Sequence, residues 1–395
     1  MQTWTPRPLP GRRVTFPRRM DFDFDHPPDR RRGDSVKWNR YAGRDVLPLW
    51  VADMDFPAAP PILEALHGRV DHGVFGYAEP WPSLVESVVE HLGGEYEWGI
   101  DPEWLVWLPG LVTGLNIACR TVGGAAFTAT PVYPPFLSAS REMVTAPLVL
   151  HDDRWRWDLA EVEKALTPET RLFLLCHPHN PVGREWDESE LRAIDALAER
   201  HGMVVCSDEI HCGLVLDAHM RHRPFATLSA SAAKRSITLM SPSKTFNLPG
   251  LGCAFAIIPD EALRMAFRRA MRGIVPHVNV LGWVACEAAF RHGASWHRAL
   301  LEYLRANRDR VLAELGSVPS LRTTRGEATY LAWIDARATG RAHPHRWLEQ
   351  AGVGLSAGRD FGPSGTYEGF LRLNFGCSRT TLDEALARIR AALGA

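Results

Sequence analysis

From residue 104 to residue 258, short apolar runs alternate with stretches that have helical periodicity. Short apolar runs between helices are typical of strands that are buried on both faces of a parallel sheet. We therefore expect an α/β fold with a mostly parallel central sheet that is flanked by helices. The expected strands lie near residues 105–108, 125–129, 172–176, 203–207, 236–240 and 253–258.

The regular alternation ends at about residue 290. A helix is expected from His297 to about Leu315 and another from Thr380, with strands near 328–334 and 370–375 between them. This α+β character indicates a second, smaller domain. The expected division is an N-terminal arm at 1–35, a small domain at 36–60 plus 291–395, and a large domain at 61–290.

The charge balance gives no reason to expect a nucleic-acid or membrane partner. The formal net charge is -1, and arginines near the N-terminus, such as Arg30 and Arg31, are interleaved with aspartates, such as Asp29. This favours a solvated, self-pairing segment. No apolar run reaches the roughly 18 residues of a membrane span, and no signal peptide is recognisable. The seven cysteines form no CxxC motif, which fits the reducing cytoplasm.

Lys244 lies in a loop that directly follows the expected strand at 236–240. The loop reads Ser241-Pro-Ser-Lys-Thr-Phe-Asn247, and ligands of open α/β sheets bind at this end of the strands. A lysine amine is the nucleophile that Schiff-base chemistry requires. Lys244 is therefore a candidate for such chemistry, although a solvated loop lysine would give the same local pattern.

Two other polar side chains follow expected strands. Asp208 follows the strand at 203–207, where a buried acid is costly unless a cation such as a protonated ring nitrogen meets it. Asn180 follows the strand at 172–176 between two prolines, and its amide can donate to a phenolate-like oxygen. The alternatives are a helix N-cap for Asp208 and a turn residue for Asn180.

His177 and His179 flank this second loop and could in principle bind a metal. A metal site needs at least three converging ligands, and no third ligand is spaced nearby in the sequence. We therefore expect no metal.

The turn Pro109-Gly-Leu-Val-Thr-Gly114 opens an expected helix. Free N–H groups and the positive end of the helix dipole suit a phosphate there, and Ser241 and Ser243 would add hydroxyl donors. An ordinary strand-to-helix turn is the alternative.

An aromatic and a basic side chain complete the candidate residues. Tyr133, on the proline-rich loop Thr130–Phe136, could stack on a planar ring, although a packing role explains it equally well. Arg372, in an alternating strand pattern, could bind a carboxylate with two hydrogen bonds, or could lie on the surface of an edge strand.

Together these residues indicate one cofactor, an aldehyde-bearing pyridine phosphate. Such a cofactor needs an amine for its aldehyde, an acid for its ring nitrogen, a donor for its ring oxygen and a cup for its phosphate. Lys244, Asp208, Asn180 and the Gly/Ser-rich turns supply these four parts, all at expected strand ends.

The motifs resemble those of the fold-type I pyridoxal-phosphate (PLP) enzymes of the class I/II aminotransferase superfamily. Within it, the chain is most similar to the cystathionine β-lyase type of C–S lyase. The resemblance covers about residues 20–394 and implies an aspartate aminotransferase-like fold with a seven-stranded sheet. Its motifs are LPLWVADMDFPA, HGVFGY, TPVYPPF, HPHNPVGREW, SDEIHCGLV, SPSKTFNLPGLG, ATYLAWID and FLRLNFGCSR.

The resemblance implies a role for each matching residue. Lys244 forms the Schiff base and moves the Cα proton, Asp208 pairs with the ring nitrogen, and Tyr133 stacks on the ring. The other implied cofactor contacts are Asn180 to the ring 3-oxygen, His211 where many aminotransferases have tyrosine, and Ser241, Ser243 and the backbone of Gly110, Leu111 and Val112 at the phosphate. Tyr77 is expected to reach the phosphate across a homodimer interface. Arg372, helped by backbone near Ala52, is expected to bind the substrate carboxylate.

The chain departs from the family pattern at four places, of which Gly252 is the most telling. Many aminotransferases have a phosphate-binding arginine at this position, so a standard aminotransferase is disfavoured. The others are His177 in place of asparagine, Thr113-Gly114 in place of Pro-Ala or Pro-Ser, and a shortened loop from Val122 to Ala126. They leave the cofactor in place and put the ordinary substrate in doubt.

The expected activity is β-elimination on cystathionine or another S-substituted L-cysteine, which yields a thiol, pyruvate and ammonia. The alternatives with the same cofactor are an aminotransferase and an oxidative deaminase of a cysteine conjugate. A regulatory protein without catalysis is a further alternative, against which the full set of cofactor residues argues.

Overall fold

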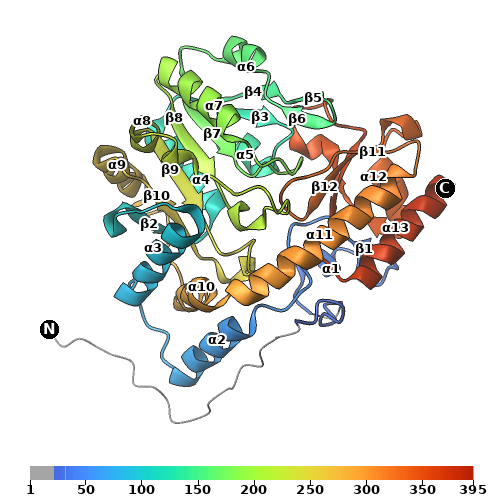
Figure 1. Ribbon diagram of the computed structural model, residues 1–395, viewed down its shortest axis with the longest axis horizontal. Coiled ribbons are helices and arrows are strands. Elements are labelled where there is room, and N and C mark those ends of the chain that lie inside the picture. Colours follow the sequence, from blue (N-terminus) through green and yellow to red (C-terminus); the bar gives the residue numbers. More distant parts are fainter. Residues whose placement is uncertain (1–21, 32, 395) are drawn as a thin grey trace.

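The structure is a computed structural model that describes residues 22–31 and 33–394, so most of the expected arm at 1–35 lies outside the described residues. At its centre is a seven-stranded sheet (Figure 1). The five strands from β9 to β4 run parallel, and β10 runs antiparallel to both its neighbours. In spatial order the strands are β2 (Leu105–Leu108), β10 (Ala254–Ile257), β9 (Ser236–Met240), β8 (Val204–Asp208), β7 (Thr170–Cys176), β3 (Ala125–Thr130) and β4 (Met143–Pro147).

The sheet confirms the expected α/β fold, and all six expected strands are present. The strand that the sequence pattern missed is β4, at the edge of the sheet. Most of its side chains are only partly buried, so it lacks the continuous apolar run by which the other strands were recognised.

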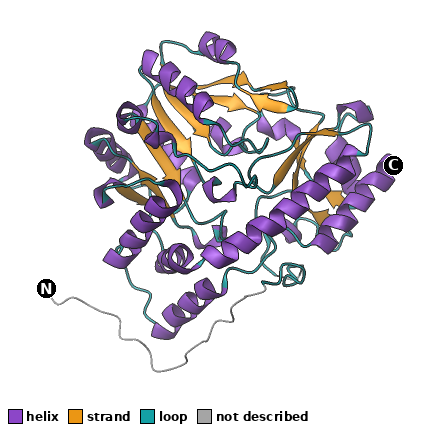
Figure 2. Ribbon diagram, in the orientation of Figure 1, coloured by secondary structure: helices purple, strands orange, loops and turns teal. Residues whose placement is uncertain are grey.

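Helices cover both faces of the sheet (Figure 2). On one face, Leu115, Phe136 and Phe267 pack against apolar side chains of the central strands; their helices are α4 (Leu111–Val122), α5 (Pro134–Ser138) and α9 (Glu261–Met271). The other face is covered by α3 (Pro82–Tyr96), α6 (Leu159–Ala165), α7 (Glu188–Arg200) and α8 (Ala230–Lys234).

Helix α7 shows how local sequence sets an element boundary. Asp187 accepts a hydrogen bond from the Glu190 backbone and Glu190 accepts one from the Asp187 backbone, which forms the capping box. Caps of this kind stabilise a helix by about 1 kcal/mol. The apolar stripe of α7, made by Leu191, Ile194 and Leu197, is fully buried.

A second sheet, of four antiparallel strands, lies beside the first (Figure 1). Its order is β11 (Arg322–Thr323), β12 (Leu331–Asp335), β15 (Phe370–Asn374) and β14 (Ser356–Ala357). The strand expected near 328–334 begins only at Leu331, because Thr329 has a φ of 70° that interrupts an extended backbone. With this sheet lie α11 (Ala294–Gly316), α12 (Pro344–Gln350), α13 (Arg379–Leu393) and the parallel pair β1 (Leu47–Pro48) and β13 (Val353–Gly354).

The remaining elements are α1 (Val36–Asn39), α2 (Pro60–His72), α10 (Val280–His292) and the hairpin of β5 (Val149–His151) and β6 (Arg154–Arg156). None of the helices in the described part of the chain has both the length and the apolar character that a membrane crossing requires.

Glycines in and directly after helix α4 explain two of the departures from the family pattern. A side-chain carbon at Gly114 would lie 2.9 Å from both δ carbons of Leu239 in β9, so the helix packs unusually close to the sheet. Gly123 and Gly124 alone join α4 to β3, with φ values of 69° and 70°, which L side chains rarely adopt. The link from Val122 to Ala125 is therefore as short as the sequence indicated.

Candidate active site

The loops that follow β7, β8 and β9 meet at one edge of the central sheet. They place Asn180, Asp208 and Lys244 around one cavity of about 230 Å³. The three residues come from separate segments, and the parallel pairing of their strands brings them together. The cavity is also lined by Ala52, Pro109, Gly110, Leu111, Val112, Thr113, Tyr133, Phe136, Cys176, Ile210, His211, Ser243, Pro249 and Gly252.

Lys244 extends its amine into this cavity and donates a hydrogen bond to the Ala52 carbonyl at 2.5 Å. Burial lowers the pKa of the amine to about 8, and the positive charge of Arg372 acts in the same direction, whereas Asp53 and Asp208 oppose it. In mildly alkaline solution, the Lys244 amine is therefore neutral in a large fraction of the molecules, as a nucleophile or base must be.

Asp208 is the last residue of β8, and its side chain is only 5% exposed. Its oxygen accepts a hydrogen bond from the Ile210 backbone at 3.1 Å, but no cation of the described residues forms an ion pair with it. Burial therefore raises the pKa of this carboxyl to about 7. A carboxylate in such surroundings is suited to a cationic partner that residues 22–31 and 33–394 do not provide.

Arg372 reaches the same region from β15 of the second sheet. Its guanidinium donates to Asn180 Oδ1 at 3.0 Å and to the Trp50 carbonyl at 2.9 Å. It is 5% exposed, and burial lowers its pKa to about 10. Its Nε has no hydrogen-bond partner among the described residues, so the group retains a donor for a carboxylate ligand.

The start of α4 forms part of the cavity wall. Gly110 is its N-cap residue and supplies no side-chain cap, so the first N–H groups of the helix remain available to an anion. Ser243 lines the cavity as well. Ser241 does not, because its hydroxyl donates to the Cys253 carbonyl at 2.6 Å and lies 2.8 Å from the Ser243 hydroxyl.

Tyr133 and His211 line the cavity, and Tyr77 does not. Burial and the neighbouring Lys244 charge hold the His211 pKa well below its usual value, so the ring is neutral. Its Nδ1 is buried without a hydrogen-bond partner in the described chain. Tyr77 is fully exposed.

Sequence reasoning missed a buried polar cluster behind Asp208. His222 bridges two carboxylates, with Nδ1 3.0 Å from Glu185 and Nε2 2.9 Å from Glu209. Burial disfavours its charged form, but the Glu185 and Glu209 carboxylates outweigh this effect and raise the pKa of His222 to about 10. The protonated His222 ring can therefore hold the two carboxylates together.

His177 belongs to this cluster and not to the cavity wall. Its Nε2 lies 3.5 Å from Glu185 and 3.1 Å from the Arg223 carbonyl. His177, Glu185 and His222 bring possible ligand atoms within 4.8 Å of one another. The sequence offered no signal for this arrangement, because His222 lies on a distant loop. The departure from the family pattern at His177 therefore changes the buried polar cluster and not the lining of the cavity.

The chemistry of the cavity fits PLP. The carboxyl of Asp208 suits a protonated ring nitrogen, the amine of Lys244 suits an aldehyde, and the uncapped start of α4 suits a phosphate. The unpartnered Nδ1 of His211 adds a further polar group at the wall.

Comparison with known proteins decides the family. A family model described as aminotransferase class I and II matches residues 44–389. The chain belongs to this family. The resemblance that the motifs indicated is thereby confirmed, and the relatives also support the C–S lyase branch within it.

Three relatives illustrate the similarity. The cystathionine beta-lyase PatB of Bacillus subtilis (strain 168) is 38% identical over 389 residues, which cover 94% of this chain and 100% of PatB. A crystal structure of OvoB has 48% sequence identity and a TM-score of 0.91, covering 94% of this chain and 99% of OvoB. The PLP-bound C–S lyase from Staphylococcus hominis is 30% identical with a TM-score of 0.88, covering 95% of this chain and 98% of that chain.

Proposed function

We propose that the protein is a PLP-dependent C–S lyase that acts on cystathionine or another S-substituted L-cysteine. The products are a thiol, pyruvate and ammonia, and one water is consumed. The observation that carries the proposal is the buried Asp208 carboxyl, without a cationic partner in the described chain, in the same cavity as the Lys244 amine. Relatives with the names cystathionine beta-lyase and C–S lyase support the reaction type.

We propose the following contacts for the cofactor. Lys244 binds its aldehyde carbon, Asp208 keeps its ring nitrogen protonated, and Asn180 donates to its ring oxygen. When bound, PLP would accept the electron pair that remains at Cα after proton removal. The other proposed contacts are Tyr133 and His211 at the ring, and Ser243 with the backbone of Gly110, Leu111 and Val112 at the phosphate; Ser241 supports Ser243.

Lys244 is also proposed to move the substrate proton. Its amine, with a pKa near 8, can take the proton from Cα in its neutral form. The bond between Cβ and sulfur then breaks, and the sulfur leaves with the electron pair as a thiolate. Arg372, held against the Trp50 carbonyl at 2.9 Å, binds the α-carboxylate and so orients the Cα–H bond toward the lysine.

Product analysis tests this function. The purified holoenzyme is given a panel of S-substituted cysteines without any 2-oxo acid, and pyruvate and thiol are measured. We expect both products, and Lys244→Ala should reduce the rate by about a thousandfold or more. An absolute need for a 2-oxo acid would instead identify an aminotransferase, and consumption of oxygen an oxidative deaminase.

Assembly and location are part of the proposal. A homodimer in which Tyr77 contacts the partner's cofactor phosphate would explain why this tyrosine is fully exposed beside the exposed Phe75. If sites are shared, mixing the Tyr77→Phe and Lys244→Ala proteins should give more activity than the two proteins give separately, because one site of each mixed dimer then keeps both residues. A cytoplasmic location agrees with seven free cysteines.

The division into domains is also a proposal. It comprises an arm at 1–35, a large domain at 61–290 and a small domain at 36–60 plus 291–395.

A further inference from the structure

One short backbone segment, Trp50–Asp55, contacts both Lys244, which lines the cavity, and Arg372, which contacts the lining residue Asn180. The Trp50 carbonyl accepts a hydrogen bond from Arg372 at 2.9 Å, and the Ala52 carbonyl accepts one from Lys244 at 2.5 Å. The Ala52 carbonyl also accepts from the Tyr330 hydroxyl at 2.9 Å. The position of this segment therefore determines where the carboxylate-binding and proton-moving groups lie relative to each other.

The segment has no regular structure of its own after β1, and side chains hold its other carbonyls. Asn374 donates to the carbonyls of Val51 and Asp53 at 2.6 and 2.7 Å. Asn247 donates to the Met54 carbonyl at 2.9 Å and accepts from the Met54 N–H at 3.0 Å. Asn374 lies on β15 with Arg372, and Asn247 lies in the same loop as Lys244. The two asparagines that hold the segment therefore come from the same elements as the two cations that it contacts.

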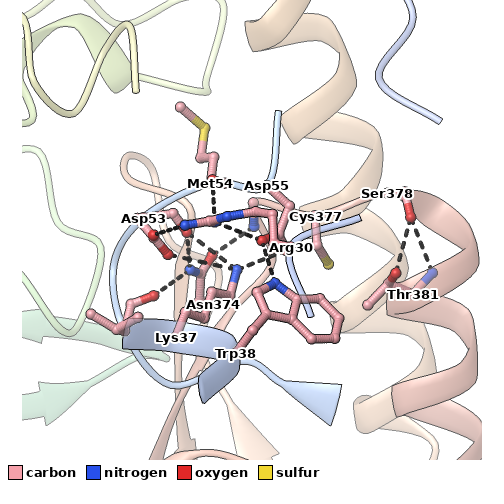
Figure 3. Close-up of polar contacts among 12 residues, drawn as sticks. Arg30, Lys37, Trp38, Asp53, Met54, Asp55, Asn374, Cys377, Ser378 and Thr381 are labelled. Carbon is pink, nitrogen blue, oxygen red and sulfur yellow. Dashed lines mark hydrogen bonds and ion pairs between the residues drawn. The ribbon is translucent and has the colours of Figure 1, made fainter. Parts of the chain in front are cut away.

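A third set of contacts comes from the N-terminal part of the chain (Figure 3). Arg30 donates to the Met54 carbonyl at 3.1 Å, to Asp55 at 2.9 Å and to Asp53 at 2.8 Å. Lys37 donates to the second oxygen of Asp55 at 2.8 Å. We call Arg30 and Lys37, with the Trp38 indole that also donates to Asp55 at 3.0 Å, the clamp.

For Arg30, the clamp corrects the sequence expectation that the early arginines pair with neighbouring aspartates in solvent. Arg31 does so, with Asp29 at 3.1 Å, but Arg30 pairs with the segment instead. Arg12, Arg13, Arg18, Arg19 and Arg32 lie outside the described residues. The Lys37 side chain is 0% exposed and that of Asp55 is 6% exposed. Burying such a pair contributes little net stability by itself.

We propose that Arg30 and Lys37 are positioning residues of the active site. They act through Asp53 and Asp55, which fix the Trp50 and Ala52 carbonyls and thereby orient Arg372 and Lys244. This inference rests on the proposed function, which gives Arg372 and Lys244 their roles. Arg30 and Lys37 precede residues 44–389, which match the family model, and the inference gives them a part in substrate binding.

The test compares Arg30→Gln with Arg31→Gln in the PLP-loaded protein. The two arginines are neighbours in sequence, but only Arg30 contacts the segment, and Arg31 is 73% exposed. Three quantities are measured: KM for the best S-substituted cysteine, kcat per bound cofactor, and the Kd of 3-(methylthio)propanoate. The last compound carries a carboxylate without an amine and therefore probes the Arg372 site without turnover.

We expect Arg30→Gln to raise both KM and the propanoate Kd about tenfold, because charge-assisted hydrogen bonds to the segment are lost. Its kcat per bound cofactor should fall as well, because the Ala52 carbonyl no longer holds Lys244 in place, and Arg31→Gln should match wild type in all three quantities. Arg30→Lys keeps the charge but cannot make all three contacts, so its KM should be intermediate. A purely structural role would instead lower cofactor content and Tm and leave KM and Kd unchanged.

Equal KM and Kd values in Arg30→Gln and Arg31→Gln would overturn the proposal. If Arg30→Gln does not fold, Asp53→Asn decides, because it weakens the contact to Arg30 without burying an unpaired cation. The clamp then predicts a raised KM and Kd for Asp53→Asn, and wild-type values would refute it. A wild-type protein that releases no pyruvate would contradict the proposed function, whereas the Kd comparison would still test the clamp.

Discussion

The guanidinium of Arg372 donates a hydrogen bond to Oδ1 of Asn180 at 3.0 Å, although 192 residues separate them. Because the amide oxygen of Asn180 accepts from a cation, its NH2 group is the end that remains to donate. This contact orients the proposed ligand of the ring oxygen and joins it to the proposed carboxylate site.

Arg372→Lys is expected to reduce kcat/KM by about ten- to a hundredfold. Lysine keeps the positive charge but cannot bind Asn180, the Trp50 carbonyl and a substrate carboxylate together. Steady-state kinetics at saturating PLP measure the effect, with the exposed Arg341→Lys as a control. Unaltered kinetics in Arg372→Lys would mean that the substrate carboxylate binds elsewhere.

Asp208→Asn is expected to stabilise the cofactor-free protein in alkaline solution. The folded-state pKa of Asp208 is about 7, above the ordinary value of 3.8, so the folded protein binds more protons than the unfolded chain between these pH values. Wild-type stability therefore falls as pH rises from about 4 to 7, and above that range the cost is about 4 kcal/mol.

Urea unfolding of cofactor-free wild type and Asp208→Asn at pH 5 and pH 8 measures this difference. The advantage of the variant should grow with pH. Once PLP is bound, the order should reverse, because the carboxylate then has its cation. Identical pH dependence in both proteins would show that Asp208 is not held in apolar surroundings.

His222→Gln is expected to destabilise the protein more at pH 6 than at pH 10. The Glu185 and Glu209 carboxylates raise the pKa of His222 to about 10 against an ordinary 6.5. Its stabilising charge is therefore fully present below about pH 6.5 and is lost as pH rises through 10. Thermal or urea unfolding of wild type and variant across this range checks the prediction, and His219→Gln serves as the control.

Gly252→Ala is expected to cost about 1–2 kcal/mol of stability, whereas Gly250→Ala should be nearly neutral. Gly252 has a φ of 56°, and an added carbon would lie 3.1 Å from the Pro109 carbonyl. At Gly250, no atom of the described residues outside its chain neighbours lies within 4 Å of such a carbon. Denaturant unfolding compares the two.

The same strain bears on reaction type. An arginine at position 252 would adopt the same unfavourable backbone, so Gly252→Arg should not bring about amino transfer. Efficient transfer to a 2-oxo acid in that variant would contradict this reading of the site.

The sequence predicted those cavity residues whose chemistry follows directly from the local sequence pattern. Lys244, Asp208 and Asn180 each follow an apolar strand, and parallel pairing necessarily gathers such strand ends at one edge. The rest depended on contacts between distant segments. The hydroxyl of Ser241 is taken by the Cys253 carbonyl, and no spacing rule indicates that.

Charge patterning was the weakest guide. The interleaved arginines and aspartates near the N-terminus looked alike, yet Arg31 pairs locally and Arg30 pairs with Asp53 and Asp55. Likewise, the spacing of His177 and His179 indicated no third ligand, although Glu185 and His222 meet His177 in space. Such pairs form where the backbone brings segments together, and local composition carries no information about that.

The close approach of Gly114 to Leu239 limits which substitutions the sequence can accept during evolution. Leu239 is fully buried, and its δ carbons fill the space that a methyl group at position 114 would need. Alanine or serine at 114 therefore requires either a shift of the Leu239 side chain or a smaller residue at 239. Across a set of diverging relatives, we expect changes at 114 to be accompanied by changes at 239 more often than by chance.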